Sequence, residues 1–197
     1  MPTLQQEVDR EPIPHLWTRE EYYRMADFGF FRNKRVELIE GQVVEMSPMK
    51  SPHATGVELV AAALRQVLGS GVFVREQKPL VLSELSEPEP DVAVVSGSIR
   101  DYAKDHPRTA LLVVEVSDST LRFDRQTKSG LYAEAAVREY WILNLGDRCL
   151  EVYRSPEQVA DTVDKFQYRE KIIYTPEDRV SSLIFPESRI AVIDLLP

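Results

Sequence analysis

Apolar residues run almost unbroken through two short segments near the middle of the chain. Residues 111–116 read LLVVEV, and residues 91–95 read DVAVV. Aliphatic runs of four to eight residues are typical of strands covered on both faces of a sheet. We therefore predict two buried strands, one carrying Glu115 inside its apolar run and one beginning at Asp91.

Three other segments predict helices, two from apolar residues at helical spacing and one from a capping pattern. Residues 53–68 place most of their aliphatic side chains on one face, which predicts a helix beginning at His53. A second helix is predicted over residues 124–136, with Asp124 as its N-cap. Thr18 and Glu21 have the spacing of a capping box and predict a first helix that ends near residues 27–29.

The remaining pattern predicts short strands and loops. Glu40 and Gly41 separate two strand-like runs and predict a hairpin. The acidic, proline-containing residues 83–90 are interpreted as a surface connection. Further strands are expected at residues 72–75, 79–82, 140–145, 149–153, 166–174 and 190–193, the last three in an antiparallel meander. This order predicts an α/β (α+β) fold with a central mixed β-sheet flanked by helices, in a single domain over residues 16–197 after a flexible arm of residues 1–15.

Composition narrows the class of protein and its compartment. The chain has 197 residues, 43% of them hydrophobic and 28% charged, as in soluble globular proteins. No segment approaches the ~18 apolar residues of a membrane span, and the N-terminus lacks the pattern of a secretory signal. A single cysteine, Cys149, excludes an internal disulfide. We therefore expect a cytoplasmic protein.

The net charge of -8 argues against broad electrostatic attraction to nucleic acid. It does not exclude an enzyme that acts on nucleic acid, because acids in an active site add to the negative count and a bound metal offsets them. The three histidines show no zinc spacing. Walker-type, GxGxxG and GxSxG motifs are also absent from the sequence.

The candidate chemistry starts from Glu115. Burying an unpaired carboxylate costs several kcal/mol, on the order of its desolvation penalty, so Glu115 needs a cation, a proton or a metal. If the two central strands are neighbours, the period of two places Asp91 and Glu115 in one cleft. Lys128 lies on the apolar side of the helix over residues 124–136. Two acids and a lysine can bind a divalent metal and activate water; a core ion pair and a snorkelling surface lysine are the alternatives.

The residues PEPDVAVV, LLVVEVSDST and DRQTKSGLYAEAAVREYWIL, in this order, resemble the PD-(D/E)xK nuclease superfamily. More narrowly, residues 18–194 are similar to the Uma-two family of restriction-endonuclease-like proteins, with RVELIEGQVVEMSP and His53 matching its N-terminal pattern. The resemblance implies a restriction-endonuclease-like core. It also implies an Mg²⁺- or Mn²⁺-dependent endonuclease acting on DNA.

The resemblance also implies roles for individual residues. Asp91 and Glu115 would be catalytic metal ligands, joined by the backbone carbonyl of Val116. The chain departs from the superfamily pattern two residues after Glu115, where Ser117 replaces the lysine, and Lys128 would supply the amine instead.

Two auxiliary positions and two rival functions stay open. Glu37 is a third acid or a strand-surface charge, and His53 contacts phosphate or caps its helix. A catalytically degenerate nuclease fold with a binding or regulatory role is the alternative function. A structural ion pair between Lys128 and the two acids is a third interpretation. Because many nucleases cut two strands with two subunits, a homodimer is also expected.

Overall fold

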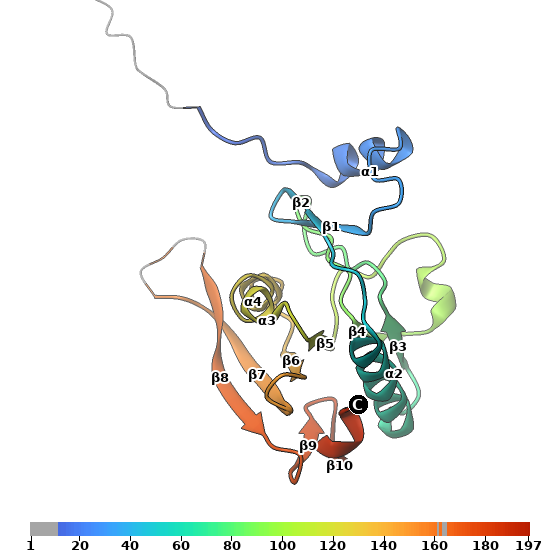
Figure 1. The fold of residues 1–197 in the computed structure, drawn as a ribbon, viewed down its shortest axis with the longest axis vertical. Helices are drawn as coiled ribbons and strands as arrows, with labels where there is room; N and C mark the ends of the chain where they lie inside the picture. Colours follow the sequence, from blue (N-terminus) through green and yellow to red (C-terminus); the bar gives the residue numbers. More distant parts are fainter. Residues whose placement is uncertain (1–11, 161, 163–164) are drawn as a thin grey trace, which may run out of the picture.

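A six-stranded mixed sheet forms the centre of the molecule, which was obtained as a computed structural model describing residues 12–160, 162 and 165–197 (Figure 1). Its strands are, in spatial order, β3 (Val72–Glu76), β4 (Val92–Ser96), β5 (Leu112–Ser117), β6 (Glu139–Asn144), β7 (Cys149–Gln158) and β8 (Phe166–Tyr174). β5 and β6 are parallel, and the other neighbouring pairs are antiparallel. The predicted mixed sheet is therefore confirmed, including the antiparallel pairing of β7 with β8. Residues 190–193 do not extend this meander as predicted, because residues 190 and 191 pair with residues 179 and 180 in a separate two-stranded sheet.

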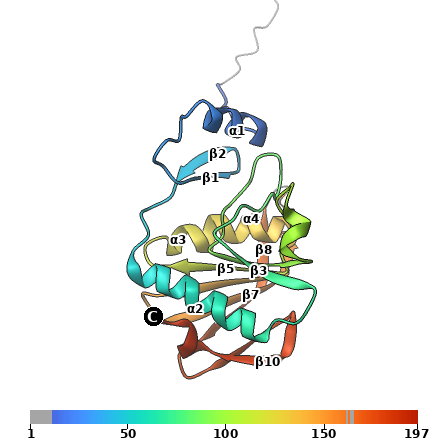
Figure 2. The ribbon, with the colours of Figure 1, turned by 90° about the vertical axis from the view of Figure 1, so that its right-hand side faces the viewer.

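Helices cover both faces of this sheet (Figures 1 and 2). On one face α2 (Ser51–Val67) packs beside the C-terminal hairpin of β9 (Arg179–Ser182) and β10 (Phe185–Ala191), which leads into the 3₁₀ turn η3 (Val192–Leu195). The other face carries a continuous helical segment made of α3 (Leu121–Phe123), the π-helical turn η2 (Asp124–Lys128) and α4 (Ser129–Glu134). Each face buries its own apolar cluster, so the strands between them are apolar on both sides.

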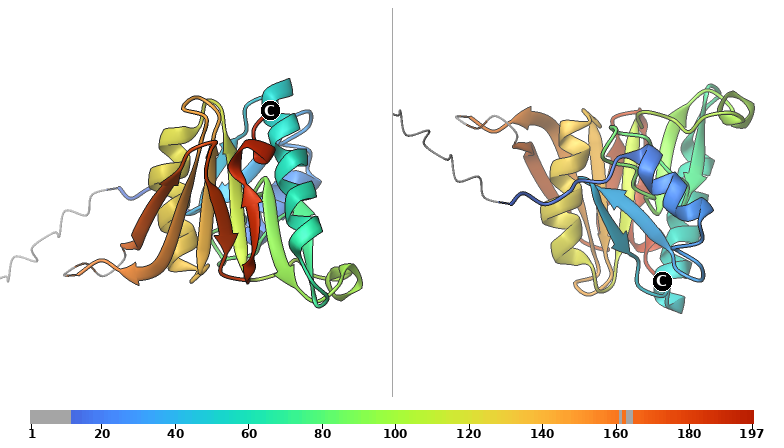
Figure 3. Two further views of the ribbon diagram at one scale, coloured as in Figure 1. Left: turned by 90° about the horizontal axis from the view of Figure 1, so that it is seen from below. Right: turned by 90° about the horizontal axis from the view of Figure 1, so that it is seen from above.

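The N-terminal elements lie on the same side of the sheet as α4 (Figures 2 and 3). They are α1 (Arg19–Asp27) and the hairpin of β1 (Val36–Ile39) and β2 (Gln42–Glu45). The predicted capping box is present, because Thr18 and Glu21 each accept a hydrogen bond from the other's backbone N–H. α1 buries no residue fully and is held through polar contacts, notably the ion pair from Arg19 to Glu87. The hairpin contacts the helical segment through Glu37 of β1, which pairs with Lys128.

Several predicted elements differ in the structure. Residues 79–82 form no strand beyond an adjoining isolated bridge, since their backbone bonds to loop carbonyls instead. Residues 83–90 are not a surface connection: Ser86 and Glu87 are only 2% and 3% exposed. The backbone N–H of Glu87 donates to Leu38, and its carboxylate accepts from Arg19 and Tyr23, which explains how a charged residue is buried there.

Helix boundaries also shift. α2 begins at Ser51 rather than His53, with a proline in its first turn, as is common at helix starts. The helix predicted over residues 124–136 begins at Leu121, so Asp124 lies inside the helical segment and is not its N-cap. The strand β9 was not predicted, and β10 starts at Phe185 rather than residue 190.

Two further points concern the N-terminal arm and the possibility of a membrane span. Most of the predicted flexible arm, residues 1–11, lies outside the described residues. Within the described part of the chain, every helix is too short or too polar to cross a membrane.

Candidate active site

Asp91 and Glu115 lie together because β4 and β5 are antiparallel neighbours. Val92 pairs with Val114, so the next position along the ladder brings the two acids side by side. The backbone N–H of Asp91 donates to Glu115 Oε2 at 3.3 Å, and the N–H of Val116 donates to Asp91 Oδ2 at 2.9 Å. Both acids are buried, with 6% and 3% of Asp91 and Glu115 exposed.

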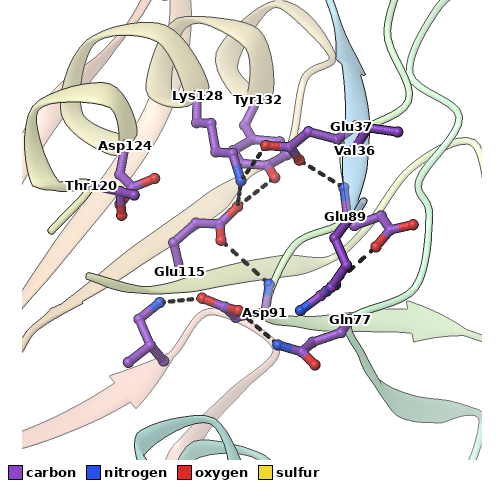
Figure 4. Close-up of polar contacts among 12 residues, drawn as sticks. Val36, Glu37, Gln77, Glu89, Asp91, Glu115, Thr120, Asp124, Lys128 and Tyr132 are labelled. Carbon is purple, nitrogen blue, oxygen red and sulfur yellow. Dashed lines mark hydrogen bonds and ion pairs between the residues drawn. The ribbon is translucent and has the colours of Figure 1, made fainter. Parts of the chain in front are cut away.

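Lys128 reaches the same site from the helical layer (Figure 4). Its Nζ lies 3.0 Å from Glu115 Oε1 and 3.3 Å from Glu37 Oε1. The hydroxyl of Tyr132, one helical turn later, donates to Glu115 Oε1 at 2.8 Å. A buried lysine is thus shared between an acid of the central sheet and an acid of the N-terminal hairpin.

Glu37 belongs to β1 and is buried, so it is not a strand-surface charge. Besides its ion pair with Lys128, its Oε2 accepts the backbone N–H of Glu89 at 3.1 Å. The loop just before Asp91 is therefore fastened to the hairpin through this carboxylate.

His53 contacts Asp91 and does not cap its helix, whose N-cap residue is Lys50. His53 Nε2 lies 3.1 Å from Asp91 Oδ2, and the amide of Gln77 donates to Asp91 Oδ1 at 3.3 Å. His53 Nδ1 is buried without a hydrogen-bond partner among the described residues. Asp91 is consequently paired with a histidine, whereas Lys128 pairs with Glu115 and Glu37.

Sequence reasoning missed a fourth acid. Asp124 is 3% exposed, and its Oδ2 accepts the hydroxyl of Thr120 at 2.7 Å. The signal was present, because Asp124, Lys128 and Tyr132 recur every four residues and so share one side of the helical segment. The N-cap interpretation concealed it. The contributions of Tyr132 and Gln77 to the site were also not recognised.

The electrostatics follow from burial and from the excess of acids. Burial raises the pKa of Glu115 to about 8, with a further rise from Asp91 opposed by Lys128. Burial also raises the pKa of Asp124. Burial alone would lower the pKa of Lys128, but the surrounding carboxylates, Glu115 first, raise it above its ordinary value.

Asp91 shifts in the opposite direction from Glu115. Burial is the largest single effect and favours its neutral form, but His53, the backbone N–H of Val116 and Lys128 together outweigh burial and hold the pKa of Asp91 below its ordinary value. The hydrogen bond with Asp91 raises the pKa of His53. The pair therefore favours a carboxylate beside an imidazolium.

These residues line a cavity of about 570 Å³. Its wall includes four buried acids, Glu37, Asp91, Glu115 and Asp124, and the cations they contact are Lys128 and His53. Two exposed acids, Glu45 and Asp118, also line it and pair with Lys34 and Lys50. Two negative charges therefore lack a cationic partner when all four acids are ionised. Such an excess favours binding of a divalent cation.

The donor set fits Mg²⁺ or Mn²⁺. Carboxylate and carbonyl oxygens are their preferred ligands, and Mg²⁺ is usually held by one or two carboxylates together with water and substrate phosphate. The carbonyl of Val116 faces the same side as its N–H, toward Asp91, because both groups of a strand residue point the same way. Across the described residues, histidine, cysteine and acidic side chains form no group of three arranged to hold a metal. An ion held here would therefore have Asp91 and Glu115 as its carboxylate ligands and would take its other ligands from the backbone, water and substrate.

Two comparisons with known proteins gave a match. The family model Uma2, described as "putative restriction endonuclease", matches residues 19–193. A crystal structure of a "putative nuclease belonging to DUF820" from Anabaena variabilis superposes with a TM-score of 0.70 at 15% sequence identity, covering 93% of this chain and 97% of that chain. This likeness shows a shared fold. A search of curated proteins found no match.

Proposed function

The chain belongs to the Uma2 family, and from this premise we propose that it is a metal-dependent endonuclease that hydrolyses phosphodiester bonds in DNA. One observation carries the proposal. Two buried carboxylates from neighbouring strands, Asp91 and Glu115, meet the buried ammonium of Lys128 at the wall of one cavity. Phosphodiester hydrolysis needs this combination of a cation site and a positioned proton donor.

Asp91, Glu115 and the carbonyl of Val116 would hold Mg²⁺ or Mn²⁺. A bound ion of this kind neutralises phosphate charge and lowers the pKa of a bound water. In the reaction, the oxygen of a water adds to phosphorus and the water gives up a proton, while the P–O ester bond breaks and the leaving oxygen takes up a proton.

Lys128 supplies fixed positive charge beside this centre. Its carboxylate neighbours keep it protonated, so its ammonium can donate to a phosphate oxygen or orient the attacking water. Glu37 positions this ammonium, and His53 holds Asp91 as a carboxylate. The hairpin and α2 therefore each contribute one positioning side chain.

The rival function is a degenerate nuclease fold with a binding or regulatory role. It is favoured by one observation: Glu115 already has partners in Lys128, Tyr132 and the backbone of Asp91. A site satisfied in this way can persist without a metal. Metal affinity therefore separates the two functions.

The test combines Mn²⁺ titration calorimetry with cleavage of supercoiled plasmid DNA. Asp91→Asn and Glu115→Gln keep the shape of each side chain, and the exposed Glu134→Gln serves as the matched control. We expect the wild type and Glu134→Gln to bind Mn²⁺ and cut DNA. Each site variant should lose about 100-fold or more in cleavage rate, the scale of losing a key electrostatic group.

Equal Mn²⁺ binding in the wild type and both site variants, with no cleavage by any of them, would favour the degenerate fold.

The proposal also includes a homodimer. It is supported by edge strand β8, which exposes Ile172 and Ile173 by 39% and 56%.

A further inference from the structure

The cavity at the acidic site is also lined by apolar side chains. They are Val44, Met46, Pro48, Met49 and Phe123. They come from β2, from the loop that follows it and from α3. One cavity therefore joins a carboxylate cluster to an apolar surface.

These apolar residues are not core residues. Among the described residues, the two apolar clusters on the faces of the sheet include none of the five. Phe123 is only partly buried, and Met49 is 40% exposed. Single exposed apolar residues are ordinary, but five that converge on one cavity beside charged groups are typical of a ligand site.

Phe123 also lines a second, shallower cavity of about 450 Å³. The two cavities share Ser119, Thr120 and Phe123, and the second continues along the exposed side of the helix at Arg122 and Gln126. Arg35 and Lys50 also line the first cavity; their side chains are 44% and 71% exposed, and they pair with Glu89 and Asp118. The two cavities that share Phe123 therefore each offer exposed cations to a chain of phosphates.

We infer that the cavity accepts an unpaired nucleobase of a DNA strand, stacked on Phe123, while the adjoining phosphate lies at Asp91 and Glu115. The inference deepens the proposed nuclease function and rests on it. A volume of about 570 Å³ is within the range of pockets for small organic groups. Aromatic rings bind bases of any sequence by stacking, and a base can enter a pocket only from a single strand or by leaving the duplex. The substrate class is thus single-stranded or locally unpaired DNA.

The experiment measures binding and cleavage separately on the full-length protein. Binding uses a 12-nucleotide single strand with one central 2-aminopurine, whose fluorescence reports stacking, in Ca²⁺ to prevent turnover. The same strand paired to its complement, and free deoxynucleoside monophosphate as a competitor, form two further arms. Cleavage in Mn²⁺ is then followed on the single strand and on the duplex.

The variant is Phe123→Leu, which keeps an apolar side chain but removes the ring. Phe28→Leu, at a phenylalanine that is 80% exposed and distant in sequence from the cavity, is the matched control. We expect the wild type and Phe28→Leu to bind the single strand at least tenfold tighter than the duplex and to quench 2-aminopurine. Phe123→Leu should bind the single strand at least about fivefold more weakly, the lower limit for losing one stacked base.

The outcomes distinguish the inference from the proposed function. Cleavage of duplex and single strand at equal rates, unaffected by Phe123→Leu, would overturn the unpaired base and leave the nuclease standing. Quenching that depends on Phe123 without cleavage would support the base site while the nuclease function fails. Displacement of the strand by monophosphate at equal molar concentration would overturn the strand as occupant in favour of a free nucleotide.

Discussion

At the scale of single residues, Lys128 balances the charge of the site. It is 5% exposed and contacts two buried acids, Glu115 and Glu37. Removing one partner of a buried ion pair leaves an uncompensated charge, which is more destabilising than removing the whole pair. We therefore expect Lys128→Met to lower the free energy of unfolding by about 3 kcal/mol, measured by urea denaturation without metal.

The double variant Lys128→Met/Glu115→Gln tests the cause of this loss. Because it removes a charge of each sign, it should recover part of the stability lost in Lys128→Met. The ion-pair explanation fails if the double variant is no more stable than the single one, or if Lys128→Met changes stability by less than the measurement error.

The sequence was informative about residues wherever burial and chemistry conflicted. Glu115 stands in an aliphatic strand and Lys128 on an apolar helical side, and both conflicts mark residues that the structure brings together. Asp124 carried no such conflict, since an acid near a predicted helix start is ordinary. Gln77 could not be predicted, because its contact with Asp91 depends on how a loop returns to the sheet.

At the scale of elements, the approach of α2 to β5 positions His53. Gly56 lies one turn after His53, and a β-carbon added there would meet Val116 Cγ1 at 3.0 Å and Leu143 Cδ2 at 3.5 Å. Alanine gains helix propensity that offsets this crowding, but a larger side chain does not fit. We expect Gly56→Val to lower the free energy of unfolding by about 1–3 kcal/mol, as is typical of overpacking.

The matched control is Ala62→Val, at an exposed position of the same helix. Both substitutions introduce valine into α2, but Ala62→Val lowers helix propensity whereas Gly56→Val does not, so propensity alone would make Ala62→Val the more destabilising change. The midpoint of urea unfolding should fall clearly more in Gly56→Val. Equal shifts in the two variants would mean that the close approach of α2 to β5 is unimportant for stability.

Elements with a clear period were predicted well, and elements defined by tertiary contacts were not. The period of α2 and the apolar runs of β4, β5 and β6 were sufficient to locate them. Residues 83–90 were wrongly placed at the surface, because the partners that allow Glu87 to be buried come from α1, 64 or more positions away. The π-helical turn η2, a form that often occurs at functional sites, leaves no signal in the hydrophobic pattern.

At the scale of the whole molecule, the mixed sheet could be predicted but its strand order could not. The hydrophobic pattern indicates which segments are helices and strands, but it does not indicate which strands are neighbours in the sheet. The parallel pairing of β5 with β6, for example, depends on how the helical crossover between them packs on the sheet. Net charge was a weak guide to the binding of nucleic acid, because it does not show which acids the fold buries and pairs with cations. The value of -8 includes buried acids such as Glu139 and Glu151, each of which the fold pairs with arginine.

Glu151 couples the stability of the whole sheet to pH. It is fully buried on β7, where it pairs with Arg125 and Lys171 and accepts the hydroxyl of Tyr153. Burial alone would raise its pKa, but these partners, Arg125 first, lower the pKa of Glu151 from 4.5 to about 2. A carboxyl with a lowered pKa in the folded state binds fewer protons than when unfolded. Its stabilisation is therefore present above pH 4.5 and is lost as the pH falls toward 2.

We expect the free energy of unfolding to fall by on the order of 1–3 kcal/mol through Glu151 between pH 5 and pH 2. The lower part of this range allows for solvent screening, because Arg125 and Lys171 are each more than one-third exposed. Urea unfolding at several pH values should give a shallower acid dependence for Glu151→Gln than for the wild type. The exposed control Glu134→Gln should follow the wild type. If Glu151→Gln instead loses stability in parallel with the wild type on acidification, other carboxylates control acid unfolding and the ion pairs of Glu151 contribute little.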